Sequence, residues 1–419
     1  MGRPPREPWL AFSGRCKEAS GGGFRSRRPI FTSNPLRRGR GVLPSAARRK
    51  RGDPVGFIRL LLALAVFNSH YPLMEDWSIV DGHEAVLTFF AISGFYMALI
   101  LDTAYASPRA FYRARMASLY PQYLFALGLA ITLLLTLGVH PYTTSAKFLA
   151  FLSHPGSLLL SLWSWLTLFG QELFFCLGQG TDGVLHFVGS TREAIWRQMP
   201  LVQAWSLSLE VAFYALAPLL VRLRSRTLFL LAAASLALKI YLFFGPLYGT
   251  GFTIRFFPAE FWLFASGILA YRVHVRLDDE SSPLDWFLLI VLVGLVLTAD
   301  DVVEEAEPFF LPLAALAAMP FVFRAFRRLP LDRLAGKISY PFYLLHFTAI
   351  ALFEKFLEEP AGWIILLFTL AGAILSHLFF SQGMKHLRRI LRLRPSLSLT
   401  PVPVPAAAPA VVKVPGGLA

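Results

Sequence analysis

The chain has 419 residues, of which 55% are apolar, 14% aromatic and only 16% charged, and its mean hydropathy is +0.55. A soluble globular protein usually carries about a quarter charged residues and has too little interior to bury so many apolar side chains. This composition excludes an ordinary soluble enzyme, a largely disordered chain and a collagen-like fibre. The two cysteines, Cys16 and Cys176, also exclude a disulfide framework. The composition therefore predicts a protein that crosses a membrane many times.

The formal net charge of +14 is concentrated at the N-terminal end. Residues 1–51 contain 14 Lys and Arg against two acids, Glu7 and Glu18, a surplus of twelve positive charges. We predict that residues 1–54 form a disordered basic tail, because they are rich in Arg, Gly, Pro and Ser and lack a sustained apolar run. Such a tail suits anionic lipid headgroups, and its few aromatic residues argue against nucleic-acid binding. A second disordered tail, basic and then rich in Pro and Ala, is expected at 386–419.

Between the tails, residues 55–385 read as one transmembrane domain. The predicted fold is all-α, a polytopic membrane bundle of about ten helices, because ten apolar runs approach the roughly 20 residues that span a bilayer. The segment 147–177 is also apolar but contains His154, Pro155 and Gly156, which indicates a helical pair or a re-entrant segment. The ten predicted spans lie near 57–73, 84–101, 119–139, 203–221, 227–244, 257–273, 284–299, 308–323, 338–356 and 361–380.

The distribution of Lys and Arg predicts the orientation in the membrane. If 147–177 makes no net crossing, the basic loops all fall on the side of the basic tail. The acidic loops 300–307 and 354–359 then fall on the opposite side. This pattern places both termini in the cytoplasm. The basic clusters lie at 109–115, 222–226, 272–276, 324–337 and 385–394.

Ionisable side chains inside the spans are the candidate functional residues, because a charge in a membrane helix is costly unless it faces a cavity or a partner. Arg59 and His70 are eleven residues apart in the first span, within about 20° of one helix face and roughly 16 Å apart along the axis. Glu210 lies in an apolar run of the fourth span, and His346 lies near the middle of the ninth. Alternative interpretations are headgroup contact for Arg59, a structural ion pair for Glu210 and a helix–helix hydrogen bond for His346.

Topology brings three of these residues to the predicted outer half. The first span ends at His70, the second begins at Glu84, and the fourth runs inward past Glu210. A solvated loop acid is an alternative interpretation of Glu84. A histidine near carboxylates can deprotonate a hydroxyl, whereas arginines at the inner ends suit a phosphorylated donor. The pattern favours group transfer across the membrane. Metal chemistry is not indicated, because the histidines lack ligand spacing and no HExxH motif occurs.

Four segments resemble, in the correct order, motifs of the membrane-bound acyltransferase 3 family, whose members O-acylate polysaccharides, lipopolysaccharide and similar glycans. Each motif alone is weak, but four in order at plausible spacing form a specific match over about residues 56–382. The four segments are RLLLALAVFNSH (59–70), AVLTFFAISGF (85–95), WSLSLEVAFY (205–214) and KISYPFYLLH (337–346).

The resemblance implies an acyl-CoA donor on the cytoplasmic side and a sugar hydroxyl acceptor outside. It makes His70 the candidate base or acyl relay, with Glu210 as a supporting acid. Leu87 stands where many members have an Asp before the second motif's FF pair, so Glu84 or Asp81 supplies the acid, unless none is needed. We expect the donor to be held by Arg59, Arg113 and Arg115, since Ser118 stands where the family has a second arginine. The expected substrate-binding residues are Trp205, Ser206, Tyr340 and His346.

The predicted function is therefore that of an integral-membrane O-acyltransferase in the cytoplasmic membrane of a bacterium. It would esterify a hydroxyl of an extracytoplasmic glycan or glycolipid, with acyl-CoA as a substrate and no permanently bound cofactor. A transporter or flippase of an anionic or glycan-linked substrate explains the intramembrane polar residues equally well. A non-catalytic scaffold explains them less well.

Overall fold

The computed structural model describes residues 55–390, apart from 75–78, 106, 279, 303–308 and 327–329. The predicted tail at 1–54 lies outside the described residues, as do residues 303–308 and 327–329. Of the second predicted tail, 386–419, residues 386–390 form the end of helix α13, and the rest lies outside the described residues. The longer helices are α1 (Gly56–His70), α2 (Gly82–Thr103), α3 (Pro108–Leu137), α6 (Ala204–Leu220), α7 (Ser225–Phe244), α9 (Phe257–His274), α10 (Pro283–Val302), α11 (Phe310–Phe326), α12 (Pro330–Phe356) and α13 (Gly362–Ile390).

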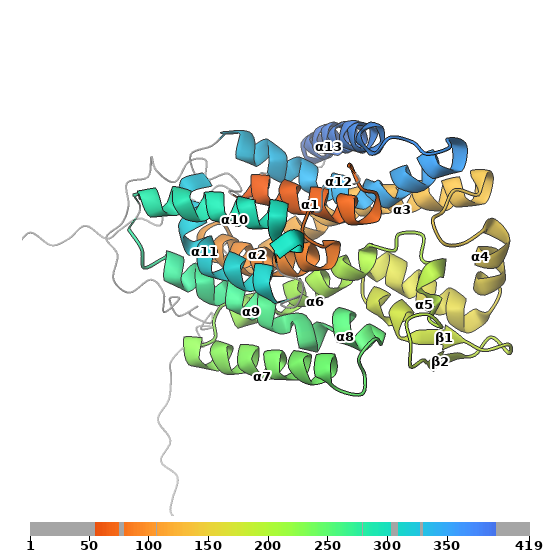
Figure 1. Ribbon diagram of the computed structural model, residues 1–419, viewed down its shortest axis with the longest axis horizontal. Coiled ribbons are helices and arrows are strands. Elements are labelled where there is room, and N and C mark those ends of the chain that lie inside the picture. Colours follow the sequence, from red (N-terminus) through yellow and green to blue (C-terminus); the bar gives the residue numbers. More distant parts are fainter. Residues whose placement is uncertain are drawn as a thin grey trace, which may run out of the picture. The chain divides into compact units, whose positions relative to one another are not determined.

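Each of the ten predicted spans overlaps one of these helices, so the all-α expectation is confirmed (Figure 1). Five helical stretches are long and apolar enough to cross a membrane: α2, α3, α7, Gly251–His274 and residues 362–381 of α13. Shorter apolar helices are α1, α6, and residues 283–298 and 310–325 of α10 and α11. The number of crossings, ten, stays a prediction.

The segment between α3 and α6 contains short elements, in keeping with the predicted helical pair. They are α4 (Ser145–Leu152), α5 (Pro155–Thr167), the 3-10 turns η2 (Gln171–Phe175) and η3 (Ile195–Gln198), and the strands β1 (Leu177–Gln179) and β2 (Leu185–Phe187). The two strands pair antiparallel. The sequence did not predict this hairpin. A further short helix, α8 (Gly251–Arg255), directly precedes α9.

Two helices begin earlier than their apolar runs. The Ser107 side chain accepts a hydrogen bond from the Ala110 N–H, and Pro108 occupies the first position of α3. Both features favour a helix start. The arginines assigned to a loop at 102–118 therefore lie on the first turns of α3. Helix α12 likewise starts at Pro330, before the predicted 338.

Helix α2 lies at the centre of the fold and packs against α1, α9 and α11. Glycines permit its close approach to α9. A Cβ on Gly94 would lie 2.8 Å from the Phe264 carbonyl carbon, and one on Gly267 would lie 2.7 Å from the Phe95 nitrogen. Small residues at helix contacts are typical of membrane bundles, where packing replaces the hydrophobic effect as the driving force. This seam fixes the α2 wall of the cavity described below.

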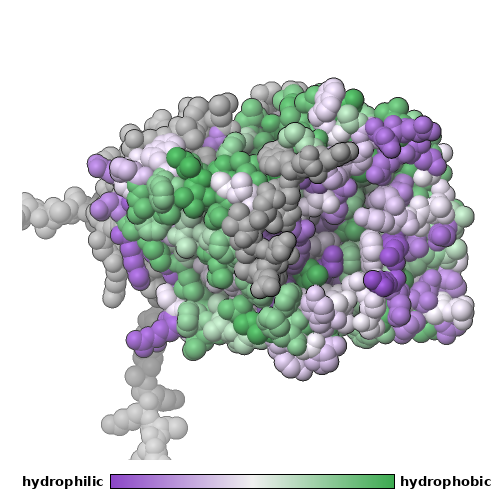
Figure 2. All heavy atoms as spheres, viewed as in Figure 1, coloured by the Kyte–Doolittle hydropathy of each residue, from purple (hydrophilic) through white to green (hydrophobic). Residues whose placement is uncertain are grey.

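The peripheral helices expose apolar side chains instead of burying them. Phe229 and Leu230 of α7 are 61% and 67% exposed, and Phe379 of α13 is 71% exposed. Figure 2 shows apolar side chains over much of one face, with hydrophilic residues more frequent toward the end that carries α4, α5 and the hairpin. Apolar surfaces of this extent require a lipid or protein environment. The chain is therefore a membrane protein.

Candidate active site

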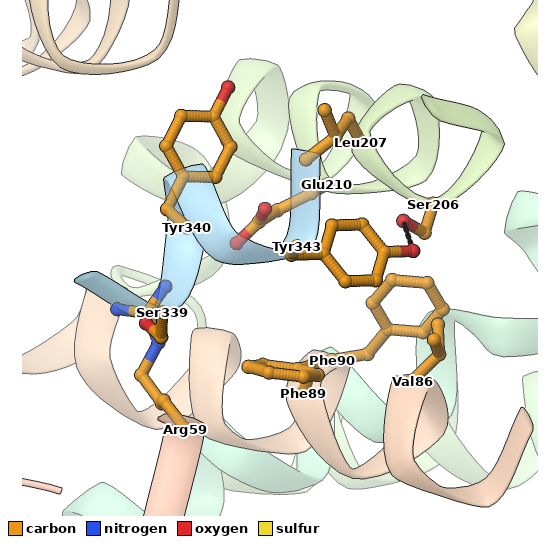
Figure 3. Close-up of a pocket in the computed structure, with 10 residues that line it drawn as sticks. All are labelled: Arg59, Val86, Phe89, Phe90, Ser206, Leu207, Glu210, Ser339, Tyr340 and Tyr343. Atoms are coloured by element: carbon orange, nitrogen blue, oxygen red, sulfur yellow. Dashed lines mark hydrogen bonds between the residues drawn. The ribbon is translucent and has the colours of Figure 1, made fainter. Parts of the chain in front are cut away.

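Four helices that are far apart in the sequence line one cavity (Figure 3). Its empty space, counted together with the part open to solvent, is about 440 Å³. Every lining residue belongs to one of the four motif segments. The lining residues are Arg59 of α1, Val86, Phe89 and Phe90 of α2, Ser206, Leu207 and Glu210 of α6, and Ser339, Tyr340 and Tyr343 of α12.

Glu210 is held in the cavity wall by two hydroxyl groups. Ser93 and Tyr214 both donate to its Oε1, each at 2.5 Å. No described residue donates a hydrogen bond to Oε2. A half-buried carboxylate with one oxygen engaged and one facing a cavity is positioned to receive a donor group from a ligand.

Arg59 is half-buried and faces the same space. Figure 3 shows its guanidinium and the Glu210 carboxylate directed into the cavity beside Ser339. Within the described residues, the ion pairs are Lys239–Glu260 and Arg324–Asp285, so Arg59 and Glu210 do not form one with each other. The structural ion pair considered for Glu210 is therefore absent from this part of the chain.

The start of α1, which carries Arg59, is fixed to α12. The Phe57 N–H donates to Asp332 Oδ1 at 2.8 Å, and Gly56 lies against Gly336. Because α12 also carries the cavity residues of the fourth motif, this contact sets the position of Arg59 relative to Tyr340 and Tyr343.

The other end of α1 carries a pair of histidines. His70 is exposed at the C-terminus of α1, and its ring stacks on the His346 ring with centroids 5.7 Å apart and an interplanar angle of 19°. It also packs on Phe347, with centroids 4.2 Å apart. The Asp81 carboxylate, which caps α2, is close enough to interact electrostatically with His70.

His346 is fully buried and its tautomer is defined by its neighbour. Its Nδ1 lies 2.7 Å from the Tyr343 carbonyl oxygen, which can only accept, so Nδ1 carries the proton. Its Nε2 is then an acceptor, and this buried atom has no hydrogen-bond partner. A buried acceptor without a partner is rare in proteins and is available to a hydroxyl group of a ligand.

Tyr343 lies between the cavity and the histidine pair. Its side chain lines the cavity and its hydroxyl is 2.8 Å from the Ser206 hydroxyl, whereas its backbone carbonyl binds His346. Glu210 shares a cavity with Arg59, whereas the ring contacts of His70 are to His346 and Phe347. The grouping of His70, Glu84 and Glu210 in the outer half stays a prediction.

The remaining candidates occupy different environments. Glu84 is 5% exposed in the first turn of α2, so the interpretation as a solvated loop acid is wrong. Trp205 is buried behind the cavity with its ring edge against Phe90. Tyr340 lines the cavity, but its hydroxyl points away and donates to the Leu119 carbonyl at 3.1 Å.

The two arginines at the start of α3 differ in their exposure to solvent. Arg113 is exposed, whereas Arg115 is half-buried, with its guanidinium 5.8 Å from the centre of the Tyr96 ring. Arg115 also interacts electrostatically with Tyr214, the partner of Glu210. Of the two, Arg115 is the arginine directed toward the protein interior.

Sequence reasoning missed several residues of the site. Ser93, Tyr214, Ser339 and Tyr343 were inside the quoted motifs, but only their contacts show that they position Glu210 or line the cavity. The spacing of Tyr340 and Tyr343 within α12, three residues, was the available signal that both lie on one face. In the described part of the chain, no group of three or more His, Cys, Asp or Glu residues could hold a metal ion.

A family model described as an acyltransferase domain, that of the acyltransferase 3 family, matches residues 55–381. The chain therefore belongs to the acyltransferase 3 family, as the four motifs predicted. It is a membrane acyltransferase. Comparisons with curated proteins and with solved structures gave no match.

Proposed function

We propose that this acyltransferase transfers an acyl group from cytoplasmic acyl-CoA to a hydroxyl of an extracytoplasmic glycan or glycolipid. One observation carries the proposal: the four motif segments together supply all ten residues that line the cavity, from Arg59 to Tyr343. A chance resemblance would have no reason to converge on one place. The proposed location is the cytoplasmic membrane of a bacterium, crossed several times, with both termini in the cytoplasm.

The donor is proposed to enter from the end of the cavity that carries Arg59. Arg115, with Arg113 nearer the surface, would hold the phosphates, because guanidinium groups bind phosphate through two parallel hydrogen bonds. The thioester end would then lie against the apolar wall of Val86, Phe89 and Leu207. This arrangement keeps the charged part of the donor near water and its acyl group away from it.

Two chemical routes to the ester suit His70. As a base, it takes the hydroxyl proton while the acceptor oxygen attacks the thioester carbonyl; the new C–O bond forms, the C–S bond breaks, and the proton passes to the CoA thiolate. As a relay, its imidazole nitrogen displaces CoA and then gives the acyl group to the hydroxyl. In both routes the products are the ester and free CoA. The buried Nε2 of His346 would orient the acceptor hydroxyl.

The other proposed roles follow from position. Glu210 would receive a hydrogen bond from the donor through its Oε2 and balance the charge of Arg59. Ser206, Tyr340 and Trp205 would shape the walls for the substrate. Glu84, buried near the outer end of α2, would act as a second acid.

The test is reconstitution of the full-length protein in proteoliposomes with acyl-CoA inside and an envelope glycan extract outside. Release of free CoA, together with an acyl mass increment on the glycan by mass spectrometry, is the expected result. Glycan or solute movement with the thioester intact would support the transporter interpretation and overturn this proposal. The mass increment would also identify the acyl chain and the acceptor.

A further inference from the structure

A cation outside the cavity has no counter-ion among the described residues. Arg255 ends α8, and its guanidinium lies near two aromatic rings that meet edge to face, 3.9 Å from the centre of Phe175 and 4.9 Å from the centre of Trp205. The described residues give it no ion pair and no hydrogen bond, and its buried Nε is without a partner. A half-buried cation normally has an anion or several acceptors nearby.

Two other interior arginines also have a buried Nε without a partner, but their terminal nitrogens are hydrogen-bonded. Arg272 donates to the Ser225 hydroxyl and to two backbone carbonyls, and Arg324 donates to the Asp285 carboxylate. Glu172, which like Arg255 interacts electrostatically with Cys176, accepts a hydrogen bond from Ser208. The positive charge of Arg255 is therefore left for a group that the described residues do not provide.

A row of aromatic rings leads from Arg255 to His70. Phe175 stacks on Trp196 at 5.5 Å with an interplanar angle of 6°, Trp196 contacts Tyr142 at 4.9 Å, and Tyr142 contacts Phe347 at 6.2 Å. Phe347 is the residue on which His70 packs. Phe175 and Phe347 are buried, whereas Tyr142 is 41% exposed, so the Tyr142 ring offers an apolar surface that can cover a bound sugar ring.

The row is held in place by uncharged contacts. His140 donates from Nε2 to the Met199 carbonyl at 2.9 Å, and its Nδ1 accepts from the N–H groups of Tyr142 and Thr143. Burial lowers the pKa of His140, which keeps this imidazole neutral near pH 7. Arg255, which lies on Phe175, is the cation at the α8 end of this row of rings.

We propose that Arg255 binds the oxyanion, a phosphate or a carboxylate, of an acidic sugar in the acceptor glycan. The inference rests on the proposed function, in which the acceptor reaches His70 from outside. The planar guanidinium matches either oxyanion through two hydrogen bonds. The donor phosphates are not the occupant, because Arg59 and Arg115 lie toward the other end of α1 and α2. A lipid headgroup is another source of phosphate, and the nanodisc measurement below distinguishes it from a sugar.

The experiment measures sugar binding to the detergent-purified full chain by tryptophan fluorescence. The probes are trigalacturonate against its methyl ester, and glucose 1-phosphate against methyl glucoside. We expect at least one acidic probe to bind about tenfold or more tightly than its neutral partner, as for a charge-assisted hydrogen-bonded pair. Arg255→Gln should reduce that preference to about twofold or less, and Arg255→Lys should retain part of it, which also shows that the fold survives.

Arg197→Gln is the matched control. Its guanidinium lies 4.7 Å from the centre of the Trp196 ring in the same row, but it donates to the Arg192 carbonyl. The preference should persist in this variant.

Equal binding of acidic and neutral probes by the native chain, or a preference that survives Arg255→Gln, would overturn the proposal. So would loss of the preference in nanodiscs containing phosphatidylglycerol but not phosphatidylcholine, since a headgroup would then be the occupant. CoA release from acyl-CoA, measured separately, tests the proposed function independently.

Discussion

The cavity beside Arg59 and the histidine pair at the end of α1 differ in what their side chains can do. The cavity contains a cation, a carboxylate held by two hydroxyls, and apolar walls. The histidine pair contains one exposed imidazole and one buried imidazole with a free acceptor nitrogen. The first arrangement suits holding a substrate, and the second suits moving a proton. Arg59 and His70 lie roughly 16 Å apart on one helix. Substrate binding is therefore assigned to the level of Arg59 along α1, and proton transfer to the level of His70.

The largest expected effect is that of His70→Ala. Removing a base or relay lowers kcat by about two to four orders of magnitude, whereas KM for acyl-CoA changes little because the donor is held at the other level. The exposed ring at a helix end leaves folding intact, which gel filtration checks. His186→Ala, which removes another exposed histidine, is the control and should retain full activity. Native kcat in correctly inserted His70→Ala protein would remove His70 from the mechanism.

Changes in the cavity should act on KM instead. Arg59→Gln removes a charge-assisted contact worth about 1.5–3 kcal/mol, so KM for acyl-CoA should rise about tenfold or more in steady-state kinetics. In Glu210→Gln, the amide oxygen can still accept from Ser93 and Tyr214, so the unfolding temperature should hardly move while KM rises. If either variant reduced kcat alone, the division of roles between the two levels would be wrong.

Substitution of the two arginines of α3 tests where the donor phosphates bind relative to the cavity. Arg115→Gln should raise KM for acyl-CoA by several-fold, because Arg115 lies over Tyr96 and faces the interior. Arg113→Gln should change KM by less than about twofold, since isolated exposed charges contribute little. Equal effects of the two substitutions, measured side by side, would show that the donor phosphates bind at the surface of α3.

An effect smaller than those of His70→Ala and Arg59→Gln is expected at Tyr343, which joins the two levels. Tyr343→Phe removes a hydrogen bond to Ser206 worth about 1 kcal/mol, but leaves the backbone carbonyl that binds His346. Activity should fall by less than about tenfold. A loss as large as that of His70→Ala would instead identify the Tyr343 hydroxyl as a proton carrier between the levels.

Apolar run length predicted the helices well, because lipid demands a continuous apolar segment for each crossing. The cost of intramembrane charge likewise singled out Arg59 and Glu210. Spacing within one helix cannot show which side chains of different helices share a cavity. The sequence grouped Glu210 with His70, whereas the structure shows Glu210 in the same cavity as Arg59. Arg272 and Arg324 were counted among the basic clusters used for orientation, yet both bind partners within the fold. Arg255 escaped notice because its significance depends on Phe175 and Trp205, which come from other elements.

The central claim is that acyl-CoA occupies the cavity formed by the four motif segments. Photo-crosslinking tests it directly, with an acyl-CoA that carries a diazirine in its acyl chain, followed by peptide mass spectrometry of the native protein. The account predicts adducts on Phe89, Phe90 or Leu207 that excess unlabelled acyl-CoA prevents. Adducts confined to exposed apolar residues such as Phe229 and Phe379, unaffected by that competitor, would contradict it.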